Sequence, residues 1–127
     1  MAGRGTRYQR PKTARAASVL IYANPSTGLP ATLRALRADA LLKRDGHRSA
    51  TVETAEQLST ILVGGRFDVI LVASPAAPTV EQLVGSAADR PLVVPVDSRP
   101  KPATLLGAID RAVEQRDRNL KNAGTGL

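Results

Sequence analysis

The apolar run from Val69 to Ala73 constrains the fold of this chain more than any other stretch. The run is rich in β-branched residues, Phe67 and Asp68 precede it, and a turn-forming Pro-Ala-Ala-Pro sequence (75–78) closes it. Unbroken apolar runs of this length are typical of strands that are buried on both faces of a parallel sheet. We therefore expect this run to be the central strand of such a sheet.

The rest of the chain alternates between strand-like and helix-like segments. Apolar or alternating runs predict further strands over 18–24, 48–53 and 91–97. A helix is expected after each strand, because apolar residues recur at helical spacing and Thr-x-x-Gln capping boxes begin at Thr54 and Thr79. The side chains expected on the buried faces of these helices are Leu33, Leu36, Ala40, Leu41, Leu58, Ile61, Leu62, Val80, Leu83, Val84, Ala87, Leu105, Leu106, Ile109, Ala112 and Val113. This alternation is typical of right-handed β-α-β units, and it predicts a three-layer α/β fold whose parallel strands follow the flavodoxin-like order 2-1-3-4.

Length and composition limit the class of protein. The chain has 127 residues, enough for one small domain with a single core. It has no cysteine, which excludes disulfides and thiolate metal sites. Its apolar runs are far shorter than the ~18 residues that a membrane span needs, and no hydrophobic segment follows the first residues as in a secretory signal. We expect a soluble cytoplasmic protein without a membrane partner.

The net charge of +7 is concentrated at the start of the chain. No acidic residue occurs before residue 17, whereas the basic residues there are Arg4, Arg7, Arg10, Lys12 and Arg15. Glycine and small residues surround these charges, so we predict a flexible basic arm over 1–16, a folded domain over 17–118 and a flexible tail over 119–127. The arm is expected either to contact nucleic acid weakly through phosphates or to act only as a solubilising end.

Several stretches resemble the receiver domain of two-component response regulators, the CheY-like family. The segment 67–78 is similar to the third strand of that family, Val19 to Tyr22 to its first strand, and Gly46 to Ala55 to its Gly-x-x-Val-x-x-Ala stretch. Lys101-Pro102 is similar to the Lys-Pro pair before its last helix. The resemblance covers Ser18 to Val113 and implies the receiver fold.

The resemblance also implies a phosphorylation pocket, and here the pocket is degenerate. A receiver uses two acidic residues to hold Mg²⁺, an aspartate to accept the phosphoryl group, a Ser or Thr to sense it and a lysine to pair with it. This chain has Ala23 and Asn24 at the acidic pair, Ala73 at the acceptor, and Val96 or Asp97 at the hydroxyl position; only Lys101 is kept. We therefore expect no phosphotransfer, no metal, no cofactor and no enzymatic activity.

The chain also lacks the helix and strand that a receiver has between Asp97 and Lys101. The strand at 91–97 is then expected to be an open edge, which Pro95 favours because proline has no N–H to donate. The alternative is that Pro95 marks a bulge and that the tail covers the edge. The residues expected to form an interaction edge are Leu92, Val94, Pro95, Val96, Leu105 and Ile109.

Two other candidate sites are weaker. His47, the only histidine, follows a helix-stopping glycine and is expected to be a loop residue without a function. The loop from Asn24 to Gly28 lies where flavodoxins hold a phosphate, but its two nearby prolines and the scarcity of aromatic residues favour a turn and helix cap.

The sequence as a whole predicts a pseudo-receiver that acts independently of phosphorylation, as a dimerisation or protein–protein interaction module in bacterial signalling. A homodimer or a signalling protein is the expected partner. The alternatives are a small flavodoxin-like ligand- or phosphate-binding domain, and a nucleic-acid accessory protein that uses the basic arm.

Overall fold

The structure is a computed structural model, and it describes residues 17–25, 27–64, 67–85, 90–97 and 101–125, without the side chains of 35–36 and 123–125. The basic arm (1–16) therefore lies outside the described residues, as does Ala87. The predicted boundaries of the folded domain remain predictions.

Four parallel strands form one sheet, and their order confirms the predicted topology. β1 (Ser18–Tyr22), β2 (Arg48–Val52), β3 (Val69–Ala73) and β4 (Leu92–Val96) lie in the order β2-β1-β3-β4. The order is consistent with a flavodoxin-like fold. β1 pairs with β2 from Ser18–Arg48 onward, and β3 pairs with β4 from Val69–Leu92 to Ala73–Val96. All residues of β3 are buried, as expected of a central strand.

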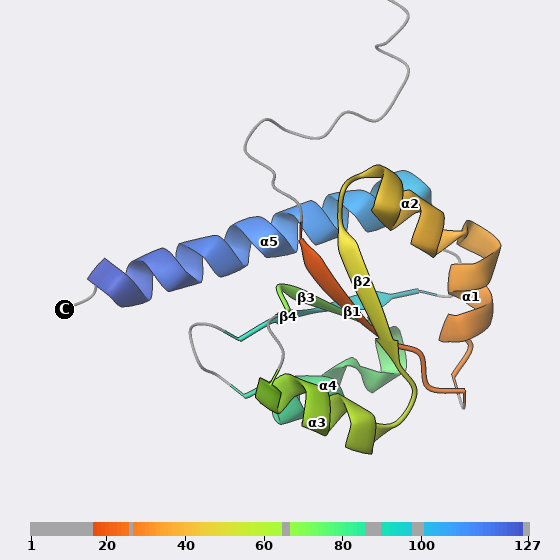
Figure 1. Cartoon of the computed structure of the whole chain (residues 1–127), viewed down its shortest axis with the longest axis horizontal. Helices are drawn as coiled ribbons and strands as arrows, with labels where there is room; N and C mark the ends of the chain where they lie inside the picture. The colour runs from red at the N-terminus through yellow and green to blue at the C-terminus, as the bar shows by residue number, and fades with distance from the viewer. Residues whose placement is uncertain (1–16, 26, 65–66, 86–89, 98–100, 126–127) are drawn as a thin grey trace, which may run out of the picture.

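Helices cover both faces of the sheet (Figure 1). One face is covered by α1 (Leu29–Leu36), α2 (Ala38–Arg44) and α5 (Pro102–Thr125). The other face is covered by α3 (Ala55–Gly64) and α4 (Ala77–Val84). The short 3-10 helix η2 (Ser74–Ala76) leads from β3 into α4. The side chains of each strand alternate between the two faces. The sheet therefore separates two apolar clusters, one that includes Leu42, Leu71 and Ile109 and another that includes Leu20, Leu58 and Ile70.

The helix predicted after β1 is interrupted. Arg37 adopts a left-handed conformation with φ of 54°, which ends α1 and begins α2. The break changes the buried positions, because it alters the direction of the helix axis: Ala38 and Leu42 are buried, whereas Ala40 is exposed and Leu41 is only half-buried. The prediction of Ala40 as a core residue was therefore wrong.

The two predicted capping boxes have different outcomes. At α3 the Gln57 N–H donates to Thr54 Oγ1 at 3.1 Å, and Gln57 Oε1 accepts from the N–H groups of Thr54 and Glu53, which confirms the first box. The second box was wrong, because α4 already begins at Ala77 and Thr79 lies inside it. Leu83, which was expected on the buried face of this helix, is exposed, so that prediction was also wrong.

The last helix is longer than predicted. Leu105, Leu106, Ile109 and Val113 are buried against the sheet, as expected. The helix continues beyond Arg118 to Thr125, so residues 119–125 are helical. A loose tail had been expected there. The C-terminal part of α5 extends past the sheet (Figure 1).

Candidate functional site

The positions that the receiver resemblance assigns to a phosphorylation pocket lie at the carboxyl ends of the strands, where open α/β sheets bind their ligands. Ala23 follows β1 and Ala73 ends β3, and both side chains are buried. β1 and β3 are neighbours in the sheet, so the structure brings these two methyl groups to the same edge, with Asn24 beside them. Neither methyl group offers an oxygen to a metal ion or a phosphoryl group.

A serine and an acid that the sequence analysis did not combine meet at this edge. Ser74 follows β3, Asp97 follows β4, and the Ser74 hydroxyl donates to Asp97 Oδ1 at 2.9 Å. Both residues come directly after neighbouring parallel strands, which is the signal that could have predicted the contact.

Lys101 is exposed beside a shallow hollow of about 320 Å³. The hollow is lined by Pro95, Val96, Asp97, Lys101, Thr104, Leu105 and Ala108. Within the described residues, no group of three His, Asp or Glu side chains is arranged to hold a metal ion.

The loop after β1 uses its own polar groups to hold its shape. Thr27 Oγ1 donates to the Asn24 carbonyl at 2.8 Å and accepts from the Leu29 N–H at 3.3 Å, at the start of α1. The Asn24 side chain donates to the Tyr22 hydroxyl at 3.0 Å. Groups that a phosphate would need are therefore engaged within the loop, which supports the turn and helix cap over a phosphate site.

β4 is one of the two edge strands of the sheet. The Leu92 N–H donates to the Asp68 carbonyl at 3.0 Å, so Leu92, Val94 and Val96 direct their backbone groups toward β3. Val93 and Pro95 direct their backbone groups away from β3, toward the open edge of the sheet. Because Pro95 has no N–H, Val93 alone presents an outward donor within the described strand.

The predicted interaction edge is only partly accessible. The side chains of Val94, Val96, Leu105 and Ile109 have 6%, 5%, 3% and 0% exposure, because α5 covers this face of β4. The loss of cover expected at Val94 and Val96 was therefore wrong, whereas Leu105 and Ile109 lie in the core, as their place on the inner face of the helix predicted. The accessible members are Leu92, which is half-buried, and Pro95, which is exposed.

A second shallow hollow, of about 330 Å³, lies beside the same strand, between α4, β4 and α5. Its lining residues are Glu81, Val84, Gly85, Arg90, Pro91, Leu92, Val93 and Ala112. The β4 edge is therefore flanked by a hollow near each of its ends.

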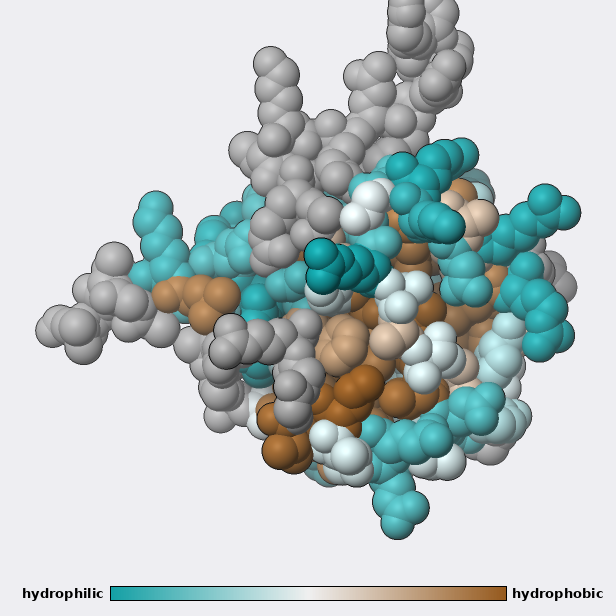
Figure 2. Space-filling model, in the orientation of Figure 1, coloured by the Kyte–Doolittle hydropathy of each residue, from teal (hydrophilic) through white to brown (hydrophobic). Residues whose placement is uncertain are grey.

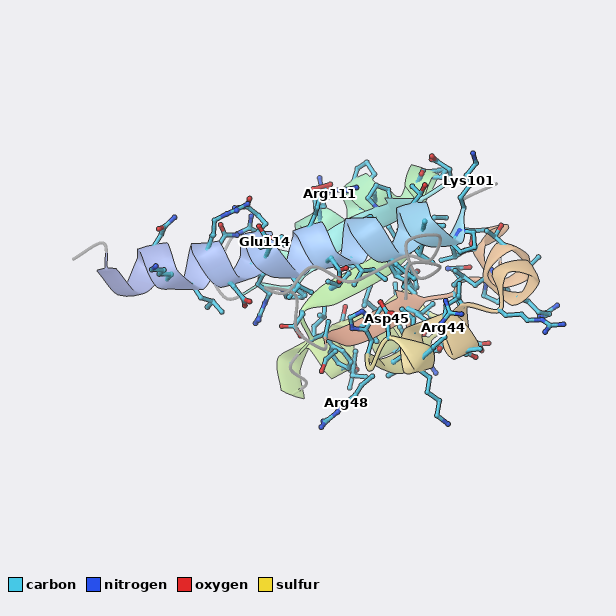
Figure 3. All side chains as sticks on the ribbon, turned by 90° about the horizontal axis from the view of Figure 1, so that it is seen from above. Arg44, Asp45, Arg48, Lys101, Arg111 and Glu114 are labelled. Atoms are coloured by element: carbon cyan, nitrogen blue, oxygen red, sulfur yellow. The ribbon has the colours of Figure 1, made fainter. Side chains whose placement is uncertain are left out.

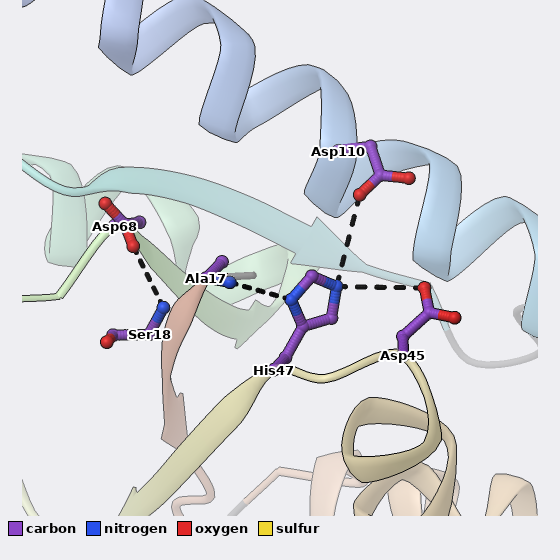
Figure 4. A network of polar contacts seen from close by, with 6 residues as sticks. All are labelled: Ala17, Ser18, Asp45, His47, Asp68 and Asp110. Carbon is purple, nitrogen blue, oxygen red and sulfur yellow. Dashed lines mark hydrogen bonds and ion pairs between the residues drawn. The ribbon is translucent and has the colours of Figure 1, made fainter. Parts of the chain in front are cut away.

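His47 lies in the turn between α2 and β2, as expected, but it is buried, with only 5% of it exposed. Its Nδ1 accepts a hydrogen bond from the Ala17 N–H at 2.9 Å, and its Nε2 lies 3.8 Å from Asp45 Oδ2 and 4.0 Å from Asp110 Oδ1 (Figure 4). A nitrogen that accepts a hydrogen bond carries no proton, so in the neutral ring the proton is on Nε2 and faces the two carboxylates. His47 thereby joins the start of β1, the turn before β2, and α5, and we assign it a structural role.

No protein-family model, curated protein or solved structure matches this chain. The fold alone defines its class, a parallel four-stranded α/β domain with the strand order 2-1-3-4. Among the described helices, none is long and apolar enough to cross a membrane.

Proposed function

We propose that this protein is a pseudo-receiver that works without phosphorylation, as a dimerisation or protein–protein interaction module in bacterial signalling. The strand order and the position of Lys101 after β4 support the relation to receivers. The methyl groups of Ala23 and Ala73, at the ends of β1 and β3, support the loss of phosphotransfer. Function then depends on a binding surface.

The accessible β4 edge is the observation that carries this proposal. An edge strand with an apolar side is a surface that proteins usually cover. Here Leu92 and Val93 are half-buried, Pro95 is exposed, and hollows of about 330 and 320 Å³ lie beside the strand. Side chains of a partner would fill these hollows.

The partner is expected to pack against β4 and not to extend the sheet. Strand addition needs a row of outward N–H and C=O groups, and Pro95 removes a donor from that row. Side-chain packing has no such requirement. A second copy of the chain related by a two-fold axis is the partner with the simplest geometry, because one surface then serves both subunits.

Light scattering over a wide range of protein concentration tests the proposal. The wild-type protein should form a dimer as the concentration rises, and Leu92→Lys should shift the dimerisation to higher concentration. Val63→Lys is the matched control, because Val63 is an apolar residue with 91% exposure on α3, away from β4. Val94→Lys is unsuitable because it would place a charge inside the core. A wild-type protein that remains monomeric, or a control that weakens the dimer as much as Leu92→Lys, would contradict the homodimer.

A further inference from the structure

β2 is the second edge strand of the sheet, and part of its backbone is open. The Arg48 N–H and the Val52 carbonyl, at its two ends, are hydrogen-bonded to the residues that flank β1, each at 2.8 Å. Alternate residues of a parallel ladder bond to the same neighbour, so Ser49 and Thr51 direct their backbone groups away from β1. Within the part of the chain that the structure describes, no hydrogen bond reaches these outward groups. The β2 edge thus presents two N–H donors and two carbonyl acceptors in a row.

The two edges of the sheet differ in how open they are to a further strand. Proteins usually protect an edge strand with a proline, a bulge or charged side chains. β4 contains Pro95, whereas β2 contains no proline and pairs with β1 without a bulge over its whole length. The middle residues of β2, Ser49, Ala50 and Thr51, have small side chains, and Arg48 is its only charged residue. β2 is therefore the edge along which an extended chain can form backbone hydrogen bonds, the mode of binding known as β-augmentation.

The α3 side of β2 carries an apolar surface that is only partly covered. Ala50 points toward this side and is half-buried, as are Ile61 and Leu62 of α3, which pack against the same apolar cluster. Figure 2 shows an apolar area over one end of α3 and hydrophilic side chains over α1 and α2. On the other side of the strand, Ser49 and Thr51 are exposed. A strand added to β2 would therefore cover apolar surface with every second side chain and leave the others in water.

Charges of opposite sign mark the two ends of β2. Arg48 begins the strand and Glu53 follows it; both are exposed, and neither forms an ion pair with another described residue. In Figure 3, Arg48 and Lys101 lie on opposite sides of α5, so this edge is separate from the β4 edge. The exposed charges on α2 and at the junction before it have both signs: Arg37, Asp39, Lys43 and Arg44. Asp45, in the turn after α2, faces His47. The ends of β2 therefore favour an acidic residue beside Arg48 and a basic residue beside Glu53.

We infer that the β2 edge binds an extended segment of a protein partner as an additional antiparallel strand. The partner residues opposite Ser49 and Thr51 each exchange two hydrogen bonds with β2, and antiparallel pairing is slightly more stable per residue than parallel pairing. The sheet then has five strands. This binding goes beyond the proposed β4 contact and does not depend on it, because the two strands are at opposite edges of the sheet.

The side chains of the partner segment follow from those of β2, because residues directly opposite each other in an antiparallel pair point to the same face. The segment has apolar side chains opposite Ala50 and Val52. It has an acidic residue opposite Arg48 and a basic residue opposite Glu53. A second copy of the chain fits less well: pairing of two β2 strands about a two-fold axis at Ala50 puts Arg48 of one copy opposite Val52 of the other, and so places a charge on the apolar face.

Titration of the ¹⁵N-labelled full chain with the capped peptide Lys-Val-Thr-Val-Thr-Glu tests the inference. In the antiparallel register, the two valines of the peptide lie opposite Val52 and Ala50, and the backbone groups of its two threonines face Thr51 and Ser49. The amide resonances of Ser49 and Thr51 should shift and their hydrogen exchange should slow. The amide of Val93, the outward donor of β4, should be unaffected.

Two N-methylated forms of the peptide are the matched controls. Methylation of the two threonine nitrogens removes the donors that face β2 and should weaken binding by at least about tenfold. Methylation of the two valine nitrogens, which face away from β2, should weaken it much less. In the protein, Thr51→Pro removes an outward N–H and should weaken binding, whereas Thr51→Val keeps it and should not. Circular dichroism establishes that both variants are folded, and Leu92→Lys should bind the peptide as the wild type does.

Three results of the titration overturn the inference: no shift at Ser49 and Thr51 with millimolar peptide, equal effects of the two methylated forms, and shifts at Val93 instead. Protection of Ser49 and Thr51 from hydrogen exchange in the peptide-free protein also overturns it. Protection that is independent of protein concentration shows that the chain itself covers the edge. Protection that rises with concentration shows that a second copy occupies it.

Discussion

The guanidinium of Arg116 on α5 lies 2.8 Å from Asp68, measured between Nη1 and Oδ1, although the residues are 48 positions apart. The other carboxylate oxygen of Asp68 accepts the Ser18 N–H at 2.9 Å, and Arg116 Nε donates to the Arg90 carbonyl at 3.2 Å. Asp68 therefore connects the start of β1 to α5 and, through Arg116, to the segment before β4.

Breaking this pair should be costly, because both side chains are mostly buried, with 15% exposure for Arg116 and 12% for Asp68. Asp68→Ala or Arg116→Ala is expected to lower the free energy of unfolding by about 2–4 kcal/mol, because either change leaves one buried charge without its partner. Urea unfolding of the two single variants and the double variant measures the coupling. The exposed pair Arg118–Glu114 is the control, and Arg118→Ala should cost less than about 0.5 kcal/mol. Strictly additive effects at Asp68 and Arg116 would show that the contact contributes nothing.

His47 should be a neutral ring with its proton on Nε2 at neutral pH. The chain has a single histidine, so its ¹⁵N resonances can be assigned without ambiguity. They should show an unprotonated Nδ1, the nitrogen that accepts from Ala17. The opposite tautomer would disprove the arrangement.

Substitution of His47 tests its structural role. His47→Ala should lower the free energy of unfolding by about 2 kcal/mol, because the Ala17 N–H loses its buried acceptor. His47→Asn should recover part of this loss, since the Asn side-chain oxygen can reach a position close to that of Nδ1. Equal losses in the two variants, measured by chemical unfolding, would assign the cost to packing alone.

The protein should be inert to acetyl phosphate and beryllofluoride in the presence of Mg²⁺, because Ala23 and Ala73 supply no carboxylate. Mass spectrometry and ¹⁹F NMR measure the two reactions. Ala73→Asp alone should also remain inert, because it restores the acceptor without the metal ligands. Stoichiometric phosphorylation of the wild-type protein at the carboxyl edge of the sheet would refute this prediction.

Pro95 is expected to suppress strand pairing at the β4 edge. Pro95→Thr restores an outward N–H without disturbing β3, so the melting temperature should change little while self-association increases. Pro102→Thr, at the start of α5 and outside the sheet, is the control. Light scattering that finds no difference between the two variants would show that the missing donor is unimportant.

Removal of residues 2–16 should leave the fold intact, because their composition of charge and glycine offers little apolar surface to bury. The melting temperature is expected to change by less than about 5 °C, the shift that corresponds to roughly 1 kcal/mol in a domain of this size. A larger decrease in a thermal unfolding experiment would show that the arm packs against the domain.

The class of fold and the order of the strands could be predicted from local sequence patterns. The run from Val69 to Ala73 is apolar at every position, rich in β-branched residues and closed by a turn sequence, which favours a strand covered on both faces. The right-handedness of parallel crossovers then restricts the order of the remaining strands. The absence of carboxylates at positions 23 and 73 was equally readable, since it depends on residue type alone.

The accessibility of side chains and the contacts between distant residues could not be predicted in this way, because both depend on how the elements pack together. The periodicity of a helix predicts that one face is buried, but not where the axis changes direction, as it does at Arg37. The periodicity also does not predict how much of an edge strand a helix covers. In this protein α5 buries Val94 and Val96, whereas Pro95 stays exposed. The environment of His47 depends on where α5 crosses the start of β1, because the groups around the imidazole come from three elements that are distant in the chain. Local patterns specify elements and their order, whereas burial and long-range polar contacts arise only when the elements are packed together.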